Sequence, residues 1–76
     1  MNPNDIKQIK ASLSNIYDWE SQNLEEDFVD FLAKEIPSLD RGKVRSLFRA
    51  FDQIPAKDRD SVSFNYESFI EKHLEP

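Results

Sequence analysis

LAKEIPSLDRGKVRSLFRAF, residues 32 to 51, decides the fold of this chain, because two apolar segments with helical spacing meet within it at a turn. Pro37 ends the first segment, since the residue before a proline is pushed out of the helical region of backbone conformation. Asp40 is the expected N-cap of the second segment, because its side chain can accept a hydrogen bond from the first turn. The apolar residues that follow recur at three- and four-residue spacing: Val44, Leu47, Phe48, Phe51 and Ile54. The stretch therefore predicts a helix, a short turn and a second helix.

Helical spacing also continues on the N-terminal side of this stretch. Asn2 and Pro3 predict the start of a first helix, because Asn caps helices and Pro is tolerated at the first helical position. The predicted apolar face of this helix is Ile6, Ile9, Leu13, Ile16 and Tyr17. Asn23 can cap a further helix, which leads into the opening stretch. The predicted buried face of that helix is Leu24, Phe28, Phe31, Leu32 and Ile36.

The C-terminal part of the chain predicts one more helix after an irregular segment. Pro55 ends the preceding helix, and the polar residues 56 to 61 are expected to form a loop. Residues 62 to 64 are expected to lead in as an extended segment. The apolar side of the last helix is predicted to be Phe69, Ile70, His73 and Leu74.

These elements predict an all-α protein with one domain, residues 1 to 76. The expected architecture is a compact bundle of four short helices, at about residues 3 to 19, 24 to 36, 40 to 54 and 65 to 74. A faint repeat at a spacing of 34 residues is compatible with two helix–loop–helix units but is too short to establish a duplication. It pairs Ser12-Leu13 with Ser46-Leu47 and Tyr17-Asp18 with Phe51-Asp52.

Composition limits the function as well as the fold. The 76 residues include no Cys and one His, so neither a disulfide framework nor the ligand set of a zinc site is available. There is no Gly-rich phosphate loop, nucleophile elbow or two-histidine metal helix. We therefore expect no catalytic residues, cofactor or metal. The absence of long apolar runs predicts a cytoplasmic protein that neither spans nor enters a membrane.

Charge is distributed unevenly along the chain. The net charge is −5 at pH 7, yet residues 40 to 49 contain four basic residues and one acid, a local charge of +3. At about 100° per residue, Arg41, Arg45 and Arg49 fall on one stripe of the helix, and Lys43 falls on its far side. This basic patch could attract an acidic partner.

The leading functional hypothesis is a small non-catalytic module that binds another protein, as an adaptor, inhibitor or regulator. The predicted binding surface is the third helix, with Trp19 as a further anchor, because Trp and Arg are common in binding hot spots. Its residues are Trp19, Arg41, Lys43, Arg45 and Arg49.

Two resemblances supply alternatives from other functional classes. Leu32-Ala33, Ile36, Val44 and Leu47 resemble the buried positions of a helix-turn-helix motif, which implies DNA binding through residues 40 to 49. Pro37-Ser38-Leu39 before a helix, with Phe51-Asp52 at its end, resembles an acyl or peptidyl carrier protein. That resemblance implies attachment of a phosphopantetheine arm to Ser38.

Overall fold

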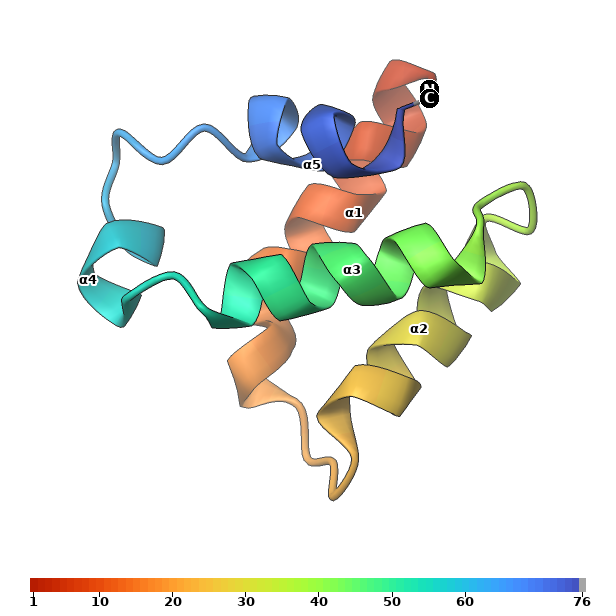
Figure 1. The fold of residues 1–76 in the computed structure, drawn as a ribbon, viewed down its shortest axis with the longest axis horizontal. Coiled ribbons are helices and arrows are strands. Elements are labelled where there is room, and N and C mark those ends of the chain that lie inside the picture. The colour runs from red at the N-terminus through yellow and green to blue at the C-terminus, as the bar shows by residue number, and fades with distance from the viewer. Residues whose placement is uncertain (76) are drawn as a thin grey trace.

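The computed structural model describes residues 1–75, which form helices joined by short connections (Figure 1). The elements are α1 (Pro3–Asn15), the 3₁₀ turn η1 (Ile16–Asp18), α2 (Leu24–Glu35), α3 (Arg41–Asp52), α4 (Ala56–Arg59) and α5 (Tyr66–Leu74). Residues 1–75 contain no strand, and the predicted all-α class is confirmed. Four of the helices correspond to the four predicted ones, and α4 is additional.

Capping side chains fix the starts of the longer helices where the sequence indicates. The Oδ1 atom of Asn2 accepts a hydrogen bond of 2.8 Å from the backbone amide of Asp5, and Pro3 is the first residue of α1. Asn23 and Asp40 cap α2 and α3 in the same way. Asn65 caps α5. These bonds satisfy amides that a helix start leaves without a partner, so each helix begins at a defined residue.

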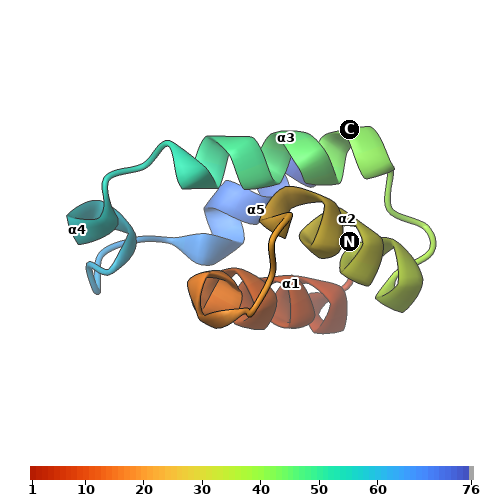
Figure 2. The ribbon, with the colours of Figure 1, turned by 90° about the horizontal axis from the view of Figure 1, so that it is seen from below.

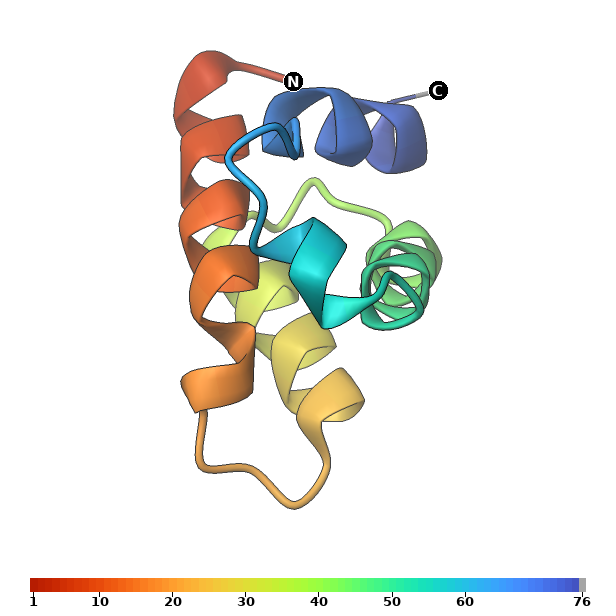
Figure 3. The ribbon, with the colours of Figure 1, turned by 90° about the vertical axis from the view of Figure 1, so that its left-hand side faces the viewer.

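The helices pack in layers, with α1 and α3 outside and α2 and α5 between them (Figure 2). α2 packs on α3, while α5 packs on both α1 and α3. An ion pair links the start of the chain to the end of α5, where the Met1 ammonium group is 2.8 Å from Oε1 of Glu75. Figure 3 shows the same order from the side, with α1 at the left, α3 at the right and α2 between them.

The core is entirely apolar, since no polar or charged residue among residues 1–75 is buried. Its members are Ile9, Leu13, Ile16, Phe28, Val29, Leu32, Ile36, Val44, Leu47, Phe48, Phe51, Ile70 and Leu74. Phe51 is the centre of an aromatic cluster that joins η1, α3, α5 and the segment before α5. This cluster lets a small chain build a core without disulfides or metal.

The structure corrects the prediction for the segment between α3 and α5. Residues 56 to 61 were expected to be a loop, but residues 56–59 form the one-turn helix α4. The guanidinium group of Arg59 lies 4.4 Å from the ring centre of Tyr17 and donates a 2.6 Å hydrogen bond to its hydroxyl oxygen. The expected extended lead-in at residues 62 to 64 is also wrong, because a turn is closed there by the Phe64 amide bonding to the Ser61 carbonyl.

Two aromatic residues differ from the predicted burial. Tyr17 is 47% exposed, because the chain has already left the α-helix at Asn15 and η1 turns this side chain outward. Phe31 is 37% exposed, since it lies at the edge of the buried stripe of α2, where Val29 takes a core position instead.

Gly42 is the chain's only glycine, and it lies in the first turn of α3 without a positive φ angle. A Cβ atom at this position would meet only the Asp40 carboxylate, at 3.7 Å or more. We therefore expect Gly42→Ala to raise the free energy of unfolding by about 0.5 kcal/mol, because Ala has less backbone freedom to lose on folding. Urea unfolding followed by circular dichroism measures this change. A decrease would show that the first turn of α3 depends on the absence of a side chain.

Candidate functional site

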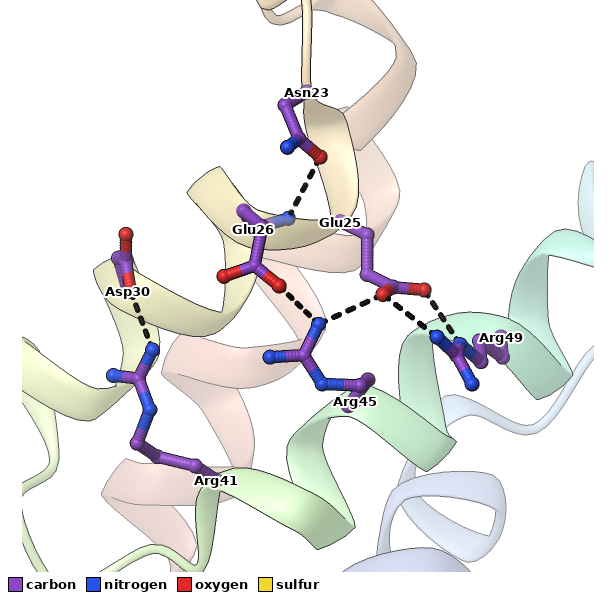
Figure 4. A network of polar contacts seen from close by, with 7 residues as sticks. All are labelled: Asn23, Glu25, Glu26, Asp30, Arg41, Arg45 and Arg49. Atoms are coloured by element: carbon purple, nitrogen blue, oxygen red, sulfur yellow. Dashed lines mark hydrogen bonds and ion pairs between the residues drawn. The ribbon is translucent and has the colours of Figure 1, made fainter.

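Three arginines of α3 lie together on one side of this helix. Arg41, Arg45 and Arg49 project from one side of α3 toward α2, which we call the arginine stripe (Figure 4). Their common direction follows from their four-residue spacing and agrees with the sequence prediction. Lys43 lies on another side of the helix and is half-buried, so the structure does not bring it together with the stripe.

Each arginine of the stripe pairs with a carboxylate of α2. Nη2 of Arg41 is 2.5 Å from Oδ1 of Asp30. Arg49 binds Glu25 through both Nε, at 2.7 Å, and Nη2, at 3.1 Å. Arg45 lies between Arg41 and Arg49 on α3. Its Nη1 atom donates a 2.8 Å hydrogen bond to Glu25 and another hydrogen bond to Glu26 (Figure 4). The arginine stripe and these three carboxylates form a row of ion pairs between α3 and α2, which we call the ion-pair ladder.

The ladder balances its own charge, since three arginines face three carboxylates. Hydrogen bonds from Arg49 and then from Arg45 lower the pKa of Glu25 from its ordinary value to about 2. The acids themselves lie in the first two turns of α2, where the helix dipole already favours negative charge. The basic cluster of the sequence thus has a structural role in joining α3 to the acidic start of α2.

The pairing of Glu25 predicts a dependence of stability on pH. A folded-state pKa near 2 means that this contribution is fully present above the ordinary pKa of about 4.5 and is lost as the pH falls toward 2. We expect Glu25→Gln to be less stable than the unmodified chain at pH 7 and to lose less stability between pH 4.5 and pH 2. Urea unfolding at a series of pH values tests this. Glu20→Gln removes an exposed carboxylate outside the ladder and controls for the loss of one negative charge, so it should lower stability at pH 7 less than Glu25→Gln does.

Trp19 lies on the opposite side of α2 from the arginine stripe, against the face that looks toward α1. Its ring centre is 6.2 Å from that of Phe28 and 5.4 Å from that of Phe31, in an edge-to-face arrangement with the latter. Trp19 is half-buried, so it packs on the core with one side and reaches the surface with the other. The structure thus separates the predicted anchor from the predicted basic surface.

A shallow groove runs between α1 and α2 beside Trp19. It has a volume of about 480 Å³ and is lined mainly by apolar surface. We call this the aromatic groove, and its lining residues are Ala11, Ser12, Asn15, Trp19 and Phe31. The sequence indicates Trp19 but not the groove, because helical spacing places Phe31 on the buried face of α2. Two acids at four-residue spacing on either side of Phe31, Asp27 and Glu35, are the signal that could have placed it near the surface.

The residues of the two alternative functions also have defined positions. Leu32, Ile36, Val44 and Leu47 are buried where α2 meets α3, as a helix-turn-helix would require. Ser38 is exposed in the turn between these helices. Within residues 1–75, no three His, Cys, Asp or Glu side chains are grouped as a metal ion needs. In the same part of the chain, no helix has both the length and the apolar character that crossing a membrane requires.

Comparisons with protein-family models, with curated proteins and with solved structures find no match to this chain. The arginine stripe and the aromatic groove are therefore the two features from which a function can be inferred.

Proposed function

We propose that this chain is a small non-catalytic module that binds another protein through the aromatic groove. The observation that carries the proposal is the exposure of Phe31 beside Trp19 on a surface that is mainly apolar. Aromatic side chains supply much of the binding energy at protein interfaces, because they bury a large area at a small cost in conformational entropy. A groove lined by two such rings is a suitable place for an apolar side chain of a partner.

The arginine stripe is less suited to be the primary surface. An acidic partner would have to displace Glu25, Glu26 or Asp30 from an arginine, so each new ion pair would replace an existing one. The exchange removes most of the electrostatic gain that an unpaired basic patch would offer. The side chains of Arg41 and Arg49 are 51% and 63% exposed, and binding of an acidic partner there is the alternative form of the same function.

DNA binding and carrier function have less physical support. A recognition helix uses arginines that are free to reach phosphates and base edges, whereas these arginines are held by α2. Ser38 lies in a turn where Ser is common for conformational reasons alone. We therefore do not extend the proposal to either class.

Site-specific photocrosslinking in the native source separates these forms of the proposal. The photoreactive amino acid p-benzoylphenylalanine is placed at Phe31 in the groove, at Ser46 beside the arginine stripe, or at Lys72 on α5 as a control. All three positions are exposed, so the fold should tolerate the change. We expect a protein adduct from position 31 and none from position 72. An adduct only from position 46 would support binding of an acidic partner, and no adduct from any position would contradict protein binding.

A further inference from the structure

The two walls of the aromatic groove differ in charge. The wall from α1 is formed by Ala11, Ser12 and Asn15, which carry no charge. On α2, Phe31 is preceded four residues earlier by Asp27 and followed four residues later by Glu35, so both carboxylates lie on nearly the same side of the helix as its ring. The groove therefore has an uncharged wall and a wall with an acid on either side of its aromatic ring.

These two carboxylates differ from the other acids of α2 in having no cationic partner. Asp27 accepts a hydrogen bond from the hydroxyl group of Ser21. Glu35 accepts a 3.4 Å hydrogen bond from the side-chain amide nitrogen, Nε2, of Gln8. Neither forms an ion pair with any residue among 1–75, whereas Glu25, Glu26 and Asp30 are all paired with arginines. The acids of α2 thus form two groups, one neutralised within the fold and one left beside the groove.

The remaining charges near the groove do not neutralise this wall. Glu20 is exposed directly after Trp19, and Lys34 is exposed on the solvent side of α2. Asp18 is exposed directly before Trp19. Together, Asp18, Glu20, Asp27, Lys34 and Glu35 carry four negative charges and one positive charge at pH 7. This negative charge would attract a partner with basic side chains and repel a partner with acidic side chains.

We infer that the aromatic groove receives an amphipathic helix in which a large apolar residue is flanked on both sides by Lys or Arg. Asp27 and Glu35 are eight residues apart on α2, which corresponds to about 12 Å along the helix axis. A partner helix that lies along the groove can match this spacing with two basic residues about eight positions apart. The large apolar residue then lies halfway between them in the partner sequence. The apolar residue inserts beside Trp19 and Phe31, and the basic residues reach the two carboxylates. This inference rests on the proposed function and adds the chemistry of the partner.

The single tryptophan of the chain makes the inference measurable, because Trp19 lines the groove itself. Three helical peptides without Trp are titrated into the full chain, and the fluorescence of Trp19 is recorded. All three carry the same central Leu, and the flanking positions are Lys, Gln or Glu. We expect the Lys peptide to give a saturable change and to bind more tightly than the Gln peptide, with the Glu peptide weakest. Raising the salt concentration should weaken only the Lys peptide, since its advantage is electrostatic.

Variants of the chain assign the binding to the proposed residues. Asp27→Asn with Glu35→Gln should weaken the Lys peptide by about five- to tenfold, as expected for two exposed ion pairs. Asp58→Asn with Glu71→Gln changes the net charge equally on other helices, α4 and α5, and should leave the affinity nearly unchanged. Phe31→Ala should weaken all peptides, and its circular dichroism should remain that of the unmodified chain because Phe31 is not a core residue.

Several results would overturn the inference. Equal binding of the three peptides would show that the groove accepts apolar side chains without regard to charge, which removes the inference and keeps the proposed function. No fluorescence change with any peptide would also remove the inference, and the crosslinks from position 31 would then decide the proposed function separately. Self-association of the chain that Phe31→Ala abolishes would identify a second copy as the occupant of the groove, in place of a basic helix.

Discussion

Phe51→Ala is expected to lower the free energy of unfolding by about 3–5 kcal/mol. Phe51 is 2% exposed, and its ring centre lies 6.2 Å from that of Tyr17. Three more rings have centres 6.0 Å away, those of Phe64, Tyr66 and Phe69. Truncation leaves a cavity where four chain segments meet, so the loss includes both apolar burial and ring contacts. A domain of this length has a total stability of roughly 4–11 kcal/mol, so the variant is expected to be close to unfolding.

Urea unfolding of matched aromatic variants checks this expectation. Phe31→Ala removes a ring of the same size that is 37% exposed, and it should cost much less than Phe51→Ala. Phe51→Leu keeps most of the apolar volume and should fold even where Phe51→Ala does not. Equal losses for Phe31→Ala and Phe51→Ala would mean that the aromatic cluster is not the main support of the core.

The fold could be predicted from the sequence wherever local signals agree with each other. Asn2, Asn23 and Asp40 cap helices where expected, because an N-cap depends only on residues within one turn. α4 could not be predicted in this way, since one turn has no apolar stripe to show a periodicity. Arg59 of α4 contacts Tyr17, which is 42 residues away in the sequence, so no local pattern indicates this contact.

The candidate sites show the same division between local and tertiary information. The alignment of Arg41, Arg45 and Arg49 follows from helix geometry alone. The identity of their partners depends on how α3 lies along α2, and no pattern within either helix indicates it. Phe31 and Phe28 are only three residues apart, yet Phe31 borders a groove and Phe28 is fully buried. The difference depends on tertiary packing, since the ring of Phe28 lies against that of Phe48 on α3.

Arg45→Glu is expected to have the second largest effect on stability, with a fall of several degrees in Tm. Arg45 lies between Glu25 and Glu26 and is the arginine of the stripe with the least exposed side chain, 29%. The substitution removes both ion pairs and places a third carboxylate beside the other two. Like charges that are partly shielded from water repel more strongly than exposed ones, so the interface between α2 and α3 should loosen. Thermal unfolding at pH 7 measures the change.

A matched substitution and a rescue variant separate pairing from simple net charge. Lys43→Glu makes the same change of charge on the same helix, but Lys43 has no ion pair among residues 1–75, so its effect should be smaller. Adding Glu26→Arg to Arg45→Glu restores an opposite pair across the interface and should recover part of the lost Tm. If Arg45→Glu and Lys43→Glu lower Tm equally, the arginines act only through the overall charge of α3. A specific loss at position 45, together with unchanged peptide binding in the aromatic groove, would instead establish that the arginine stripe supports the fold and leaves binding to the opposite side of α2.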